Sequence, residues 1–236
     1  MSKWEYGEVY KNYNMDGVIE IGTGKVKVHD LFEPLPDFMK EADCLFVDPP
    51  WNLGNLNTFY TKADRTDYKD TFEEFYDRLF ECISEIKPKT LFLEIGKEHL
   101  ADFIIKCREL YKYVTFYNST YYHKKDNKCY VIHCTNNYKE KNLKLDYLDE
   151  EDIIEYICKN VNCKCIGDLC MGRGLVGYNA FLNNKKFVGT ELNPKRLAVL
   201  VDKITKEVEK WNIYMGTLEP ARSMLEQKNL MEKEWT

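Results

Sequence analysis

The run Asp48-Pro49-Pro50-Trp51 has the residue types needed to bind a planar group that carries an amine. It follows the apolar segment Cys44–Val47, which predicts a buried strand with an acid at its carboxyl end, the edge where ligands bind in open α/β sheets. Two prolines remove backbone N–H donors and leave carbonyl acceptors, and an aromatic ring follows directly. The same pattern also fits an ordinary strand end in which Asp48 caps a turn and Trp51 joins the core.

A second motif has the composition of a nucleotide-binding turn. The segment 165–177 runs from an apolar stretch through Asp168 into a turn that contains Gly172 and Gly174 and opens a predicted helix. Glycines allow a ligand to approach the backbone closely, and a helix N-terminus offers free N–H groups to an anion. Glu191 ends the next apolar strand at the spacing expected of an acid that binds ribose hydroxyls. We therefore expect a nucleoside-bearing cofactor here. The late position in the chain argues against a dinucleotide site.

Strand patterns alternate with helical patterns along the chain, which predicts an α/β protein with a mostly parallel sheet covered on both faces. The predicted strands are 26–28, 44–47, 90–94, 114–117, 130–133, 165–169 and 186–190. The predicted helices are 71–86, 97–110, 149–161, 175–183 and 194–211. The strands 114–117 and 130–133 lie too close for a helix between them, so we expect an antiparallel hairpin with the loop 123–128 at its tip.

Composition narrows the class of protein. The 236 residues are 44% hydrophobic and 31% charged, which fits one folded domain. The net charge of −5 excludes a protein coated in positive charge but not a local basic patch. Nine cysteines without zinc-finger spacing predict reduced thiols and no metal site. Because no apolar run reaches about 18 residues and the start lacks a signal-peptide core, we expect a cytoplasmic protein without membrane contact.

The two motifs together resemble those of the S-adenosylmethionine-dependent amino-methyltransferases that act on adenine N6. Residues 48–51 match their catalytic D-P-P-[YW] motif, and residues 168–174 are similar to their cofactor motif D-x-F-x-G-x-G, with Cys170 in the place of Phe. The catalytic motif comes first, as in the permuted (beta-type) members. The resemblance implies a Rossmann-like class I methyltransferase fold with circularly permuted motif order, a terminal antiparallel hairpin and S-adenosyl-L-methionine as cofactor.

The resemblance also implies roles for individual residues. The Asp48 carboxylate and the Pro49 carbonyl would accept the two N–H groups of the amine, Trp51 would stack on the flipped base, and Pro50 completes this catalytic set. The segment 28–31 resembles a stretch in which an Asp meets the cofactor adenine, although His29 stands where the family usually has Gly. The implied cofactor-binding residues are Asp30, Leu31, Asp168, Leu169, Cys170, Gly172, Gly174, Glu191, Leu192 and Asn193.

Basic side chains in two segments predict contacts to nucleic-acid phosphates. Residues 124–144 hold six lysines against two acids, with tyrosines interleaved. The polar segment 52–70 directly follows the first motif and is predicted to be a loop that closes over the base as a lid. The predicted nucleic-acid-binding residues are Lys62, Arg65, Lys69, Lys124, Lys125 and Lys128. Ordinary solvated loops remain the alternative for both segments.

We therefore predict a single methyltransferase domain over 1–236, with a catalytic half at about 26–135, a cofactor half at about 150–211 and a reduced target-recognition region at about 118–150. The predicted activity is methylation of adenine N6 in DNA, with a restriction–modification or phage role. RNA adenosine methylation, cytosine N4 methylation and a catalytically silent subunit that binds nucleic acid in a heterodimer are the alternatives. A homodimer is also open. Because both motifs keep their acids and glycines, the sequence favours an active enzyme.

Overall fold

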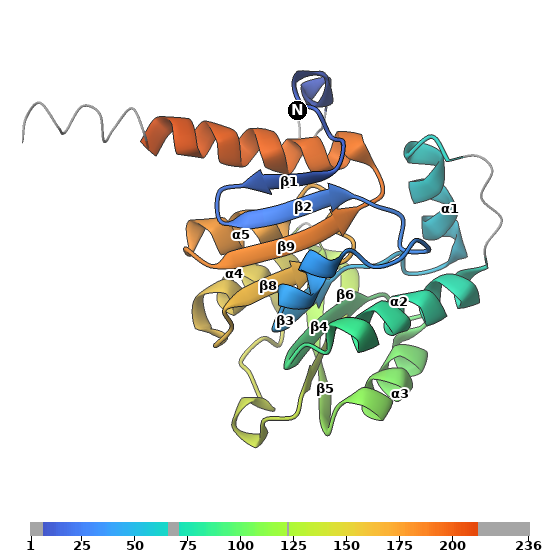
Figure 1. Ribbon diagram of the computed structural model, residues 1–236. Coiled ribbons are helices and arrows are strands. Elements are labelled where there is room, and N and C mark those ends of the chain that lie inside the picture. Colours follow the sequence, from blue (N-terminus) through green and yellow to red (C-terminus); the bar gives the residue numbers. More distant parts are fainter. Residues whose placement is uncertain (1–6, 66–70, 122, 212–236) are drawn as a thin grey trace, which may run out of the picture.

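A computed structural model describes residues 7–65, 71–121 and 123–211 (Figure 1). Its centre is a nine-stranded sheet in the order β1-β2-β9-β8-β3-β4-β6-β5-β7. The strands are β1 (Val18–Ile21), β2 (Gly24–Val28), β3 (Cys44–Val47), β4 (Thr90–Ile95), β5 (Tyr113–Tyr121), β6 (Lys124–Thr135), β7 (Leu148–Asp149), β8 (Cys165–Asp168) and β9 (Lys186–Glu191). Five neighbouring pairs are parallel and three are antiparallel. The expected mostly parallel sheet with an antiparallel hairpin is confirmed.

Helices cover both faces of the sheet. They are α1 (Leu53–Lys62), α2 (Phe72–Ile86), α3 (Leu100–Leu110), α4 (Glu150–Asn160) and α5 (Leu175–Leu182), and residues 194–211 are also helical. Three short 3-10 turns, η1 (Val9–Asn12), η2 (Asp37–Glu41) and η3 (Tyr138–Glu140), complete the described elements. Thr71 caps α2 in a capping box with Glu74, as the sequence pattern indicates. No helix within the described residues has the length and apolar composition that crossing a membrane requires.

Alternation along the strands divides the core into two layers. In β3, Leu45 and Val47 belong to the cluster that packs against α2 and α3, whereas Cys44 and Phe46 belong to the cluster that packs against α4, α5 and the helix 194–211. All four residues are buried. A strand that is buried on both faces is apolar at every position. This explains why Cys44–Val47 is continuously apolar and does not alternate between apolar and polar residues.

The carboxyl edge of the parallel strands carries a row of acids. Moving across the sheet through β2, β9, β8, β3 and β4, the acids at or just beyond the strand ends are Asp30, Glu191, Asp168, Asp48 and Glu94. β3 pairs directly with β8, which brings the two sequence motifs side by side although they lie more than 100 residues apart. This edge is therefore the place where the fold assembles a site.

Three predictions about local structure are wrong. The segment expected to be a lid loop contains α1, because Asn52 caps it and Leu56 and Tyr60 bury one face of the helix. The expected loop 123–128 is mostly strand, since β6 begins at Lys124 and pairs back onto β5. The hairpin is also not the last part of the sheet, because the two-residue β7 pairs with the outer side of β5.

The β5–β6 hairpin extends past the carboxyl edge of the sheet. β4 ends at Ile95, which lies opposite Tyr130, whereas β5 and β6 remain paired as far as Tyr121 and Lys124. β1, which the sequence patterns did not predict, forms a second hairpin with β2 through the turn at Gly22. Lys69 lies outside the described residues, as does the chain after residue 211.

Candidate functional site

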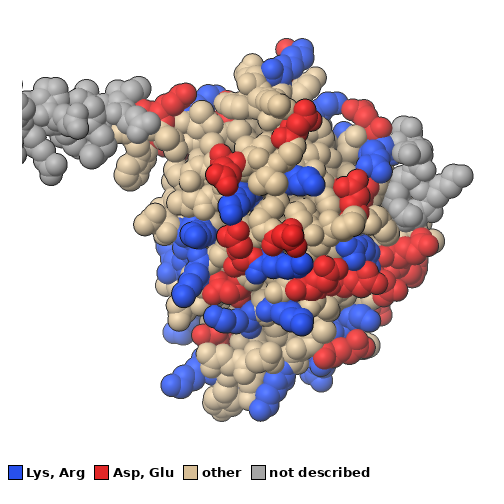
Figure 2. All heavy atoms as spheres, in the orientation of Figure 1, with Lys and Arg blue, Asp and Glu red and all other residues tan. Residues whose placement is uncertain are grey.

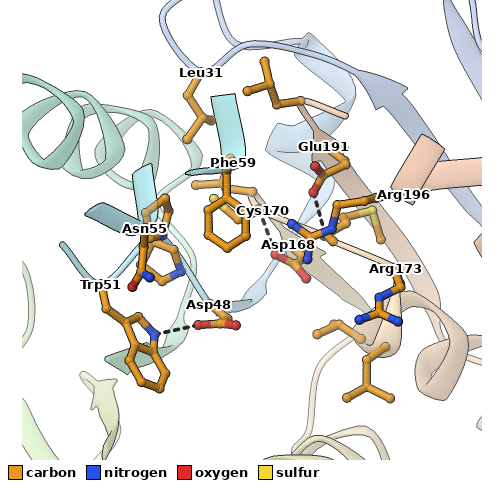
Figure 3. A pocket seen from close by; sticks show the side chains of 18 of the residues that line it. Leu31, Asp48, Trp51, Asn55, Phe59, Asp168, Cys170, Arg173, Glu191 and Arg196 are labelled. Atoms are coloured by element: carbon orange, nitrogen blue, oxygen red, sulfur yellow. Dashed lines mark hydrogen bonds between the residues drawn. The ribbon is translucent and has the colours of Figure 1, made fainter. Parts of the chain in front are cut away.

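A cavity of about 470 Å³ opens at the carboxyl edge of the sheet, and α1 forms one of its walls. Figure 3 shows the carboxylates of Asp48, Asp168 and Glu191 around this cavity, with Phe59 of α1 beside them and Trp51 at one side. All four predicted catalytic residues line it. Of the predicted cofactor-binding residues, those that line it are Asp30, Leu31, Asp168, Leu169, Cys170, Gly172, Glu191 and Leu192. The two sequence motifs therefore share one cavity.

The Asp48 carboxylate is held by two donors. The Trp51 indole Nε1–H donates to Oδ1 at 2.8 Å, and the Tyr121 hydroxyl donates to Oδ2 at 2.8 Å. Burial raises the pKa of Asp48, while these two hydrogen bonds and the nearby Arg196 oppose that shift. Each carboxylate oxygen has two lone pairs, so Asp48 can still accept a hydrogen from an incoming amine.

Tyr121 is a site residue that the sequence analysis did not assign to catalysis. It ends β5 at the carboxyl edge, contacts the Asp48 carboxylate and meets the Trp51 ring edge-on at a centroid distance of 5.5 Å. Only the length of β5 brings it there, because the strand continues through polar residues that the sequence pattern reads as loop. The hairpin is thereby tied to the first motif.

The glycine turn after β8 has the backbone geometry that its sequence predicts. Gly172 and Gly174 have φ values of 56° and 77°, in the left-handed region where a side chain is strained. The Gly172 N–H donates to Glu191 Oε2 at 2.6 Å, and the Asn193 N–H donates to Oε1 at 3.0 Å. Glu191 therefore fixes the turn as well as lining the cavity. Gly174 and Asn193 support this arrangement from outside the cavity wall.

Burial also raises the pKa values of Asp168 and Glu191. Asp168 accepts the backbone N–H of Cys170 at 2.9 Å. The Arg196 guanidinium opposes both pKa shifts and lies over the Phe59 ring at 5.0 Å. Arg196 was not predicted as a site residue, because its position on the helix 194–211 faces the cavity only after that helix packs beside β9.

The C-terminal end of α1, which forms part of the cavity wall, is anchored to the cofactor half. Tyr60 donates to Asp30 Oδ1 at 3.2 Å, and the Asn193 side-chain amide donates to the Lys62 carbonyl at 2.8 Å. The Arg65 guanidinium lies 3.1 Å from Asp30 Oδ2 in an ion pair. Lys62 lines the cavity, whereas Lys124, Lys125 and Lys128 are exposed on the first part of β6. The part of the segment 52–70 that was expected to be a lid loop is thus a helix, α1, packed against the cofactor half beside the cavity.

Three acids meet beneath the first motif. One carboxylate oxygen from each of Asp48, Glu94 and Glu150 lies within 4.8 Å of the other two. Glu94 is 0% exposed and accepts the Cys129 thiol at 2.8 Å, and its Oε2 has no hydrogen-bond partner. Burial and the neighbouring Asp48 raise the pKa of Glu150 to about 9, and burial raises that of Glu94 well above its ordinary value. No role was predicted for Glu94 or Glu150, although Glu94 ends a predicted apolar strand, 90–94, much as Asp48 follows the apolar strand 44–47.

We expect Glu150→Gln to stabilise the protein increasingly as the pH rises. The pKa of Glu150 is about 9 in the folded chain against an ordinary 4.5, so between these values the folded chain binds more protons than the unfolded chain. Glu150 therefore lowers the free energy of unfolding as pH rises through that window, and the amide removes this loss. Urea midpoints of the variant and wild type should coincide near pH 4.5 and separate by pH 9.

The charges that act most strongly on Glu150 are those of the acids Asp48, Asp149, Glu151 and Asp168, and the Glu94 carboxyl also lies close to it. Glu155→Gln is the matched control, because Glu155 lies on the same helix with its side chain 49% exposed. We expect its urea midpoint to stay close to that of wild type, because the loss of an exposed ion pair with Lys159 costs little. If the difference in urea midpoint between Glu150→Gln and wild type does not change with pH, the raised pKa of Glu150 is contradicted.

No protein-family model matches the chain, and no curated protein matches its sequence. Solved structures do match its fold. M1.HpyAVI is 14% identical over 76% of this chain and 98% of its own, with a TM-score of 0.51. TTHA0409 of Thermus thermophilus, assigned as a DNA modification methylase, is 14% identical over 72% of this chain and 88% of its own, with a TM-score of 0.51. The protein therefore has the methyltransferase-type fold that the sequence analysis predicts.

Proposed function

We propose that this protein transfers a methyl group from S-adenosylmethionine to the N6 amine of adenine in DNA. The observation that carries the proposal is that Asp48-Pro49-Pro50-Trp51 and the glycine turn before α5 line one cavity from adjacent strands, β3 and β8. The permuted motif order is part of this proposal. The alternative of a catalytically silent subunit is disfavoured, because the cavity retains both the acid of the first motif and the glycine turn.

The residues of the cavity suit the proposed cofactor. Glu191 would hold the ribose hydroxyls, Asp30 and Leu31 would contact the adenine, and Asp168 with Leu169 and Cys170 would line its path. Among the charged side chains of the wall, acids outnumber bases, which favours a ligand that carries a positive charge. S-Adenosylmethionine would supply an electrophilic methyl group on a sulfonium. Structures of M1.HpyAVI and TTHA0409 with S-adenosylmethionine support this choice.

Asp48 and Pro49 would activate the amine. The exocyclic nitrogen of adenine is a poor nucleophile because its lone pair is delocalised into the ring. Its two N–H groups would donate hydrogen bonds, one to the Asp48 carboxylate and one to the Pro49 carbonyl. These hydrogen bonds would favour tetrahedral geometry at the nitrogen and stabilise the charge that develops on it. The donors Trp51 and Tyr121 orient Asp48 and favour its ionised form. Trp51 offers a ring on which a flipped base can stack.

The hairpin is the favoured surface for the nucleic acid. Lys124, Lys125 and Lys128 are exposed on β6, and the same hairpin reaches the first motif through Tyr121. By contrast, Figure 2 shows acidic side chains gathered over α2, whose exposed face would repel phosphate. A duplex that rests on the hairpin would therefore present its flipped base to the cavity. DNA is favoured over RNA by the names of the fold neighbours.

The test is a labelling experiment with methyl-labelled S-adenosylmethionine. The purified protein is incubated with unmethylated DNA, with RNA and with each polymer plus Asp48→Ala protein, and the products are digested to nucleosides. We expect label in N6-methyldeoxyadenosine, and none with the variant. Label in cytosine or in RNA would change the base or the polymer of the proposal. No label in any polymer, with the cofactor bound, would refute it.

We expect Lys124→Ala, Lys125→Ala and Lys128→Ala, combined, to weaken DNA binding mainly through lost phosphate contacts. Each phosphate contact contributes about 0.9 to the slope of log K against log salt, so losing three contacts should flatten the slope by about 2.7. Fluorescence anisotropy across a salt series gives this slope. The triple variant Lys89→Ala, Lys106→Ala, Lys159→Ala changes the same charge away from the site and should keep the wild-type slope. Equal slopes for both variants would remove the hairpin from the interface.

A further inference from the structure

Glu150 stands in the cavity wall without a partner. It is the first residue of α4, is 8% exposed, lines the cavity and makes no hydrogen bond or ion pair with the other described residues. Its carboxyl lies within 4.8 Å of the Asp48 and Glu94 carboxyls. Because Glu150 lines the cavity and receives no partner from the described residues, a ligand in the cavity can supply the partner for its carboxyl.

The three carboxyls cannot all be charged in this space, and their surroundings decide where the charge resides. Asp48 is the one that accepts hydrogen bonds from two O–H or N–H donors, Trp51 and Tyr121, which stabilise an anion. Glu94 has a thiol on one oxygen and nothing on the other, and it is fully buried. No Lys or Arg forms an ion pair with Glu94 or Glu150 among the described residues. The charge therefore belongs on Asp48, and Glu94 and Glu150 carry protons.

We infer that Glu150 is a base-recognition residue that reads the ring nitrogen beside the methylated amine, by donating its carboxyl proton to that nitrogen. The inference rests on the proposed function. A flipped adenine presents its amine and the adjacent acceptor N1 on its Watson–Crick edge. The ionised Asp48 accepts from the amine, and the neutral Glu150 next to it donates to the acceptor. A charged acid and a neutral acid in adjacent places thus match both halves of this edge.

This pair of acids also sets specificity. Cytosine presents the same arrangement of amine and adjacent acceptor, so Glu150 alone does not separate it from adenine. Guanine and thymine carry an N–H at the corresponding ring position, and their donor would face the O–H of Glu150. A mismatch of this kind leaves buried polar groups unpaired, which is the strongest form of discrimination available to a binding site. The site therefore selects adenine and cytosine, the two bases whose Watson–Crick edge carries an amine beside an unprotonated ring nitrogen.

The decisive substrate is DNA in which 1-deazaadenine replaces the target adenine, because it keeps the amine and replaces N1 by C–H. We expect wild-type kcat/KM to fall at least tenfold with this base. Glu150→Ala should lower kcat/KM for adenine by a similar factor and should no longer distinguish the two bases. Glu150→Gln keeps a neutral donor and should stay within a few-fold of wild type on adenine. Glu155→Gln is the matched control and should behave as wild type throughout.

The charge of Glu150 is measured independently of activity. Infrared difference spectra of wild type against Glu150→Gln at pH 7 should contain a protonated carboxyl band, and its absence would overturn the inference. Undiminished discrimination between the two bases by Glu150→Ala would also overturn it. Stoichiometric Mn²⁺ binding that requires Glu150 would do the same, since the three carboxyls would then be a cation site.

Failure of the proposed function is distinguishable from failure of this inference. If wild type methylates no polymer, the proposed function fails. Calorimetric binding of deoxyadenosine and 1-deaza-2′-deoxyadenosine then decides the role of Glu150. Tighter binding of deoxyadenosine that is lost in Glu150→Ala supports the inference, and equal binding of the two nucleosides to wild type overturns it.

Discussion

Asp48→Asn should lower kcat for methyl transfer by about 10³-fold, because the charge that builds on the amine nitrogen loses its carboxylate acceptor. The amide is close in size, so the cavity should keep its shape. Its NH2 group would oppose the donors Trp51 and Tyr121, which now face a carboxylate oxygen each. Single-turnover transfer of labelled methyl groups measures the chemical step directly. Affinity for S-adenosylmethionine should stay within a few-fold of wild type.

A matched control separates this effect from a general effect of removing an acid. Asp102→Asn makes the same change on α3, at a side chain that is 62% exposed, and should keep wild-type kcat. A kcat within tenfold of wild type for Asp48→Asn would remove Asp48 from the chemical step. The fold could then still bind the cofactor, but another group would have to accept the amine hydrogen.

Phe92→Ala should lower the free energy of unfolding by about 3–5 kcal/mol, the range for truncating a fully buried aromatic residue. Phe92 is 0% exposed in the middle of β4, and its ring stacks on His133 at a centroid distance of 4.7 Å. β4 is paired on both sides, by β3 and β6, so the sheet cannot collapse into the cavity that the substitution leaves. Urea denaturation followed by circular dichroism measures the loss.

The matched control for stability is Phe116→Ala, which removes the same ring from β5. Phe116 is 45% exposed and meets Tyr130 edge-on at 5.9 Å, so we expect a loss of at most about 1 kcal/mol. Equal losses for the two variants would mean that the interior around β4 is not packed as described. An unchanged urea midpoint for Phe92→Ala would have the same meaning.

Much of the site was predictable because its residues lie in short local patterns. A buried strand followed by Asp48, and a glycine turn followed by a strand ending at Glu191, are arrangements that the sequence alone specifies. The positive φ values of Gly172 and Gly174 follow from the same local requirement. These predictions depend on interactions between neighbours in the chain, and the structure brings these residues to one cavity.

The local sequence pattern gave a wrong prediction where a segment is held in place by residues far away in the chain. α1 has a polar composition, but Tyr60 becomes buried through Asp30 and the core beneath it. The first residues of β6 are charged and read as a loop, yet they extend a hairpin whose other strand ends at Tyr121. In both cases hydrogen bonds and packing from elsewhere in the fold override the local preference.

The sequence by itself therefore determined the class of fold, the acid of the first motif and the glycine turn, because each is encoded within a few consecutive residues. The tertiary structure decided what surrounds them. Glu94 and Glu150 come from β4 and α4 and meet Asp48 only because β4 lies beside β3 and α4 begins at the same edge of the sheet. Which of these three carboxyls is ionised depends on the distances between them in space, and the spacing of the residues along the chain does not specify those distances.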